Sequence, residues 1–151
     1  MAIYVGGTGS ANLLDDYEEG TFTPVVKGSG TAGSYSSSTN PEGFYIKVGR
    51  KVEVWMNVKG SLSGASGDTQ IGGLPFSTAS NNSSNGYTAV YGAGNVSYWS
   101  GYGSKDVLGS LSPVGNTILY FHCDNGSSTG GNASAANTTH NGHIHHSYFT
   151  D

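Results

Sequence analysis

Charged side chains are scarce in this sequence. Asp, Glu, Lys and Arg make up 11% of the 151 residues, whereas ordinary soluble domains contain about 25%. The formal net charge is -4, and there is no basic patch with which a protein neutralises phosphates. The composition therefore argues against nucleic acid as a partner, and against electrostatic binding to an anionic membrane surface.

Cysteine and long apolar runs are scarce as well. The single cysteine, Cys123, excludes an internal disulfide and a four-cysteine zinc site. No apolar run approaches the ~20 residues of a membrane helix. The opening residues MAIYVGGTGSANLL lack the positive and apolar regions of a signal peptide. We therefore expect a single domain with its own core and no insertion into a membrane.

Glycine is abundant, with 25 residues, and ten tyrosines supply much of the bulk. The clearest pattern is KVEVWMNVKG, residues 51–60, in which apolar residues such as Val54 alternate with polar ones. This period of two predicts a half-buried antiparallel strand. Trp55 falls on the polar face of the strand, where a large aromatic side chain usually has a second surface over it.

The segment NTILYFHC, residues 116–123, has two largely apolar faces. Such a strand is typically buried on both sides. A single-domain sandwich covers only one of them, so a neighbouring subunit is the most economical cover for the other. Together with Trp55, the residues on one face of this segment form a candidate subunit interface: Ile118, Tyr120 and His122.

The remaining strand-like segments are short and lie between turns rich in Gly, Ser and Asn. They are TFTPVV (21–26), GFYIKVG (43–49), TQIGGLPF (69–76), GYTAVYG (86–92), NVSYWSG (95–101), DVLGSL (106–111) and GHIHHSYF (142–149). The total of roughly eight or nine strands predicts an all-β fold, an antiparallel β-sandwich or jelly roll. Polar loops are expected at residues 28–40, 77–86 and 124–139.

Three motifs resemble enzyme signatures without their context. GSGTAG, residues 28–33, matches a dinucleotide fingerprint, and GSSTG, residues 126–130, matches a serine-hydrolase elbow. Both signatures require a helix directly afterwards, but turn-forming residues follow here. The acidic run at residues 15–19 is more simply a solvated segment than a pair of glycosidase acids. We therefore expect a protein that is not an enzyme.

Aromatic residues alternate with small ones in GYTAVYGAGNVSYWSGYG, residues 86–103. Tyrosine and tryptophan favour recognition surfaces because they combine a flat apolar face with a polar tip. The alternative is that these rings pack the sandwich. Trp99 and Tyr102, beside a turn, are the better candidates for receptor contact, together with the adjacent Tyr98.

Four of the five histidines lie close together near the C-terminus of the sequence. On a strand, His143 and His145 point to one side, whereas Ile144 and His146 point to the other. Three copies around a threefold axis would bring six imidazoles together, an octahedral set suited to a transition metal such as iron, nickel or cobalt. In the alternative, the histidines pack against neighbouring subunits or face solvent, and His140 and His146 are merely polar.

Three segments in order carry a resemblance to a known family: LDDYEEGTFTPVV, then GFYIKVGRKV, then IGGLPF. They resemble the C-terminal domain found in tail fibre and tailspike proteins of tailed bacteriophages. The resemblance covers residues 11–151, and residues 1–10 look like the end of a fibre shaft or a linker. It implies a homotrimeric β-sandwich, similar to the jelly roll of tumour necrosis factor, at the tip of a fibre on the virion.

The same resemblance implies a function in host adsorption. The trimer would bind a bacterial surface receptor, a glycan or lipopolysaccharide, and would join the rest of the tail fibre. An alternative is a trimerisation or folding cap without receptor contact, and a further one is a carbohydrate-degrading module. We expect no organic cofactor. The one cofactor to test for is a transition metal bound on the threefold axis by His143 and His145.

Overall fold

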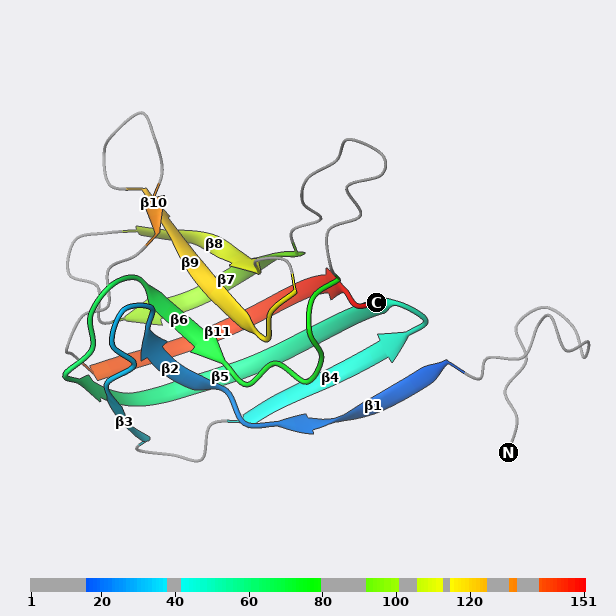
Figure 1. Ribbon diagram of the computed structural model, residues 1–151, viewed down its shortest axis with the longest axis horizontal. Helices are drawn as coiled ribbons and strands as arrows, with labels where there is room; N and C mark the ends of the chain where they lie inside the picture. Colours follow the sequence, from blue (N-terminus) through cyan, green and yellow to red (C-terminus); the bar gives the residue numbers. More distant parts are fainter. Residues whose placement is uncertain are drawn as a thin grey trace, which may run out of the picture.

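The computed structural model describes most of the chain as a set of β-strands (Figure 1). The described residues are 16–37, 42–79, 92–100, 106–112, 115–124, 131–132 and 139–151. The strands are β1 (Tyr17–Phe22), β2 (Val25–Gly28), β3 (Ser34–Ser37), β4 (Glu42–Val48), β5 (Lys51–Ser63), β6 (Thr69–Gly72), β7 (Gly92–Ser100), β8 (Asp106–Ser112), β9 (Ile118–Asp124), β10 (Gly131–Asn132) and β11 (Thr139–Phe149). Within the described part, no helix has the length and apolarity needed to cross a membrane.

All strand pairings are antiparallel. They follow the order β1-β4-β5-β11-β7-β8-β9-β6-β2, with β3 attached to β5 and β10 attached to β9. The path folds over itself, so that β9, β6 and β2 cross above the layer that contains β4, β5 and β11 (Figure 1). The prediction of an all-β antiparallel chain is therefore confirmed, and the two layers are consistent with a sandwich.

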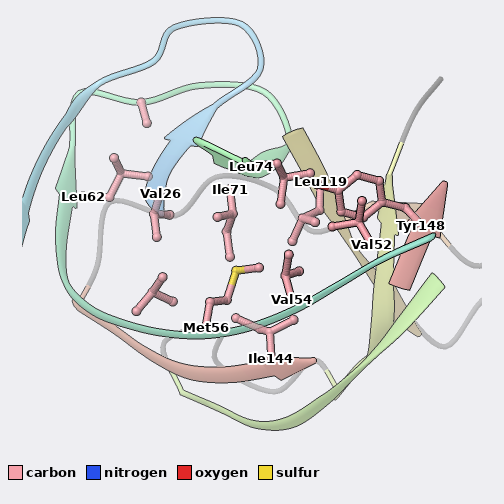
Figure 2. Close-up of a cluster of buried hydrophobic side chains, with 12 residues drawn as sticks. Val26, Val52, Val54, Met56, Leu62, Ile71, Leu74, Leu119, Ile144 and Tyr148 are labelled. Carbon is pink, nitrogen blue, oxygen red and sulfur yellow. The ribbon is translucent and has the colours of Figure 1, made fainter. Parts of the chain in front are cut away.

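The core lies between the two layers. Side chains of β5 and β11, such as Met56 and Ile144, meet those of the crossing layer, such as Ile71 and Leu119 (Figure 2). Along β5, buried and more exposed residues alternate from Lys51 to Ser63, as period-two patterning predicts. Burying each such aliphatic side chain contributes about 1.5–3 kcal/mol, so this alternation fixes which face of β5 is inside.

The segment TFTPVV differs from its prediction, because it forms parts of two strands rather than one. β1 ends at Phe22 and β2 begins at Val25, with Thr23 and Pro24 between them. The two strands lie at opposite ends of the pairing path. Proline has no backbone N–H for a ladder, so the pairing stops there and the chain passes from one layer to the other.

The predicted loops contain some pairing too. β3 lies within residues 28–40, and β10 lies within residues 124–139. The predicted strand GYTAVYG falls almost entirely on residues 80–91, outside the described part. The expected shaft segment at residues 1–10 lies outside it as well.

The glycine motif of residues 28–33 folds as a close-packed loop. A Cβ added to Gly28 would lie 2.4 Å from the backbone oxygens of Thr31 and Ser66, and Gly33 has a φ of 76°. Backbone N–H groups of Ser29 and Gly30 donate to Asp68 and Ser66 carbonyls at 2.9 and 3.0 Å. The glycines are therefore explained by the close approach of two backbone segments. This agrees with the prediction that the motif forms a turn and not a dinucleotide site.

Candidate functional site

Among the described residues, the exposed aromatic side chains lie on the solvent side of the β1-β4-β5-β11-β7 layer. We call this surface the outer face. One cross-strand row runs from Phe44 through Trp55 to His145. The next row runs from Glu42 through Asn57 and His143 to Tyr98. The outer face therefore places an aromatic row directly beside a polar one.

Trp55 and His145 stack at the centre of the outer face. Their ring centroids are 5.1 Å apart and the rings are 19° from parallel. The Nε2 atom of His145 lies 3.8 Å from a carboxylate oxygen of Glu53, and has no hydrogen-bond partner in the described part. The aromatic pair is thus bordered by one acidic group on the same strand as Trp55.

Glu53 lies beside both Lys51 and His145. Lys51 Nζ lies 2.6 Å from its carboxylate. This hydrogen bond lowers the pKa of Glu53 below its usual value, His145 adds a smaller effect in the same direction, and partial burial opposes them. The Glu53 carboxylate is therefore ionised near neutral pH and sits as a fixed acceptor beside the Trp55–His145 stack.

A bulge in β7 turns Tyr98 toward the outer face. The register with β11 shifts between His143, which pairs with Tyr98, and Ile144, which pairs with Val96. Ser97 is the extra residue, and its Oγ donates to the His143 carbonyl at 3.2 Å. In a regular strand Val96 and Tyr98 would share a face. The bulge instead lets Val96 pack against the core while Tyr98 stays 50% exposed.

Two shallow hollows flank the Phe44–Trp55 pair. One, of about 290 Å³, is lined by both residues and by Glu42, His143 and His145 among others. The other, of about 330 Å³, is lined by the same pair and by residues of β1 and β4. Aromatic walls with a few polar groups suit a ring-shaped ligand or a partner side chain.

The structure brings together only some of the residues predicted for the sites. Trp55, Tyr98, His143 and His145 share the outer face. Ile118 and Tyr120 are half-buried and alternate with the fully buried Leu119, so they point outward from the opposite layer. They do not lie beside Trp55, with which they were grouped as one interface.

Three further predicted residues lie wholly or partly outside the described part. Tyr102 lies in residues 101–105, which the structure does not describe. Trp99 and His122 are described only through the backbones of β7 and β9. Their assigned roles remain predictions.

Two features of this region were not predicted from the sequence. Phe44 is 52% exposed in the centre of the outer face, and its signal was the second apolar face of GFYIKVG. His140 and His146, interpreted as merely polar in one alternative, are both 0% exposed. The predicted orientation of His143 and His145 opposite Ile144 and His146 is confirmed, because burial alternates along β11.

Comparisons with known proteins give one structural match. The fold is similar to part of the crystal structure of the Dettilon tailspike protein (gp208), with a TM-score of 0.63 and 18% sequence identity, over 88% of this chain and 23% of that chain. A scan against protein-family models finds no match, and a search of curated proteins finds none. The chain thus has the fold of a segment that makes up less than a quarter of a phage tailspike protein.

Proposed function

We propose that this chain is a receptor-binding domain of a bacteriophage tail fibre or tailspike, acting on the virion as a homotrimer with a jelly-roll fold. The observation that carries the proposal is the fold shared with part of a tailspike protein. The three ordered motifs that resemble tail-fibre tip domains, and the exposed aromatic side chains, support it. The domain acts by binding rather than by catalysis, and it joins the rest of the fibre.

The receptor is a glycan or lipopolysaccharide of the bacterial surface, contacted through Tyr98, Trp99 and Tyr102. Aromatic rings stack on sugar faces at little cost in side-chain entropy. The double substitution Trp99→Ala/Tyr102→Ala is expected to reduce adsorption of the isolated domain to host cells at least about tenfold. Because both side chains are proposed to lie at the surface for receptor contact, the thermal midpoint should shift by less than about 2 °C.

The matched control is Val25→Ala, an exposed residue of β2 in the other layer, which should leave adsorption unchanged. Undiminished adsorption by the double variant contradicts the aromatic site. If the wild-type domain does not adsorb at all, the alternative of a trimerisation or folding cap without receptor contact is favoured.

The axial metal is a separate proposal. His143 and His145 lie on one face of β11, so three copies could present six imidazoles to a common axis. In the described residues of one chain, no group of three or more His, Cys, Asp or Glu side chains could hold a metal ion. Coordination would therefore need the imidazoles of three copies to meet on the axis.

Elemental analysis tests this site, using protein purified without a histidine tag or nickel column. The expected result is one transition-metal ion per three chains, lost in His143→Ala/His145→Ala. Metal-free protein whose trimer is equally stable with and without a chelator contradicts it, and leaves the histidines as packing residues.

A further inference from the structure

Exposed large apolar side chains gather on the outer face. Among the described residues, seven exposed large hydrophobic side chains lie on the outer face and only Val25 lies elsewhere. The seven are Tyr17, Phe44, Ile46, Val48, Trp55, Tyr98 and Phe149. The strand registers connect them, since Tyr17 pairs with Val48, and Val48 and Phe149 each pair with Lys51. They form one continuous surface rather than scattered exposures.

The area of this surface indicates whether its partner is a small ligand or a macromolecule. Five strands about 4.8 Å apart, over seven residues at about 3.3 Å each, span roughly 20 Å by 20 Å. This extent is comparable with the largest apolar patch on a typical monomeric protein, about 300–600 Å², which often marks a binding surface. A ligand in the hollow beside Trp55 and His143 would leave Ile46, Val48 and Phe149 in water. Only another protein surface covers them all.

The charges on the outer face fit a copy of the same face. Its acidic side chains are Glu19 on β1, Glu42 on β4 and Glu53 on β5, and its basic side chains Lys51 and Lys59 lie at two places along β5. Lys51 pairs with Glu53 within the chain, whereas Lys59 lies on a different strand from Glu19 and Glu42, so a rotated copy can bring opposite charges together. A face with one sign of charge would repel its own copy.

We propose that the outer face over β1, β4, β5 and β11 is the interface between copies of this chain, with the Phe44–Trp55–His145 row at its centre, whereas Tyr98 on β7 lies beside the contact and stays available to the receptor. This inference rests on the proposed homotrimer. It specifies which layer of the sandwich supplies the contact between the subunits. The opposite layer, with Ile118 and Tyr120, then faces away from the contact. Trp55 and Phe44 are large, aromatic and central, as expected for residues that dominate an interface.

Sedimentation velocity at micromolar concentration tests the assignment with single-residue variants. The wild-type protein should sediment as a trimer, whereas Trp55→Lys and Phe44→Lys should sediment as folded monomers with unchanged far-ultraviolet circular dichroism. Burying a lysine in an apolar contact costs far more than exposing it on a free surface. Val25→Lys, the matched control on the other layer, should remain trimeric.

A second measurement does not depend on how a lysine variant folds. The sequence has two tryptophans, so Trp99→Phe leaves Trp55 as the one fluorophore. Acrylamide should quench Trp55 at least about threefold more strongly after dilution to monomer, because its ring is covered in the assembly.

The outcomes separate this inference from the proposed function. A monomeric wild-type protein overturns the homotrimer and the interface together. Trimers that persist in both lysine variants, together with a Trp55 that is quenched equally in the trimer and the monomer of Trp99→Phe, overturn the interface alone. Trimers that persist while adsorption is lost identify the outer face as a receptor surface, which also overturns this assignment.

Discussion

Lowering the pH from 7 to 4 is expected to destabilise the fold by about 3 kcal/mol through His146 alone. The imidazole is fully buried on the core side of β11, opposite Val54 and Gly94. Burial lowers its pKa from 6.5 to about 4, with a smaller contribution from the neighbouring His145. Protonation would place a charge in the apolar core, which the folded state resists.

The direction follows from proton uptake. Between pH 6.5 and about 4, the unfolded chain binds a proton at this residue and the folded chain does not. The unfolded state therefore gains stability as the pH falls through this window. Above pH 6.5 both states are neutral at His146, and the contribution is absent.

Urea unfolding across this pH range, at constant protein concentration, measures the effect. In His146→Gln the part of the pH slope due to this residue should disappear, whatever the absolute stability. An unchanged slope in His146→Gln contradicts the prediction.

Replacing Tyr148 by alanine is expected to cost about 3–5 kcal/mol, the range for removing a buried aromatic ring. Tyr148 is 1% exposed and belongs to the core. Its hydroxyl donates to the Phe76 carbonyl at 3.1 Å and accepts from the Phe76 N–H at 3.4 Å. The residue therefore links β11 to the segment after β6 by packing and by hydrogen bonds.

Tyr148→Phe is the companion variant, because it removes the hydroxyl and keeps the ring. It should cost about 1–2 kcal/mol, since both backbone groups of Phe76 lose a partner. Chemical denaturation of both variants, with an unchanged m-value, measures the two contributions. Equal losses in the two variants would show that the ring itself contributes nothing.

The strands were predictable where one face is apolar and the other polar. In residues 51–60 the alternation alone fixed the inner face of β5, and the structure agrees. In β11 histidines occupy both faces. The sequence therefore predicts a strand with alternating faces, but it does not predict which of the two faces is buried. His146 is inside because its neighbours on that face, Ile144 and Tyr148, are core residues, and that depends on the crossing layer.

The candidate site was less predictable, because its parts come together only through pairing. Trp55 was singled out from its place on a polar face, but its contact with His145 joins residues 90 positions apart in sequence. The bulge at Ser97 has no sequence signature of its own, and it reverses the face that Tyr98 would occupy. Trp55 lies on one layer, and Ile118 and Tyr120 lie on the other. This separation could not be predicted without knowing that β5 and β9 belong to different layers.

The pairing of β5 with β11 also determines when the protein can fold during synthesis. β5 ends at Ser63, but the strand that pairs along most of its length begins at Thr139. A nascent chain that has emerged only as far as β9 therefore lacks an internal strand of one layer, and one edge of β5 has no hydrogen-bonding partner along most of its length. Such high contact order slows folding. Productive folding on the ribosome must wait until β11 has left the exit tunnel, and chains interrupted before it should aggregate or be degraded.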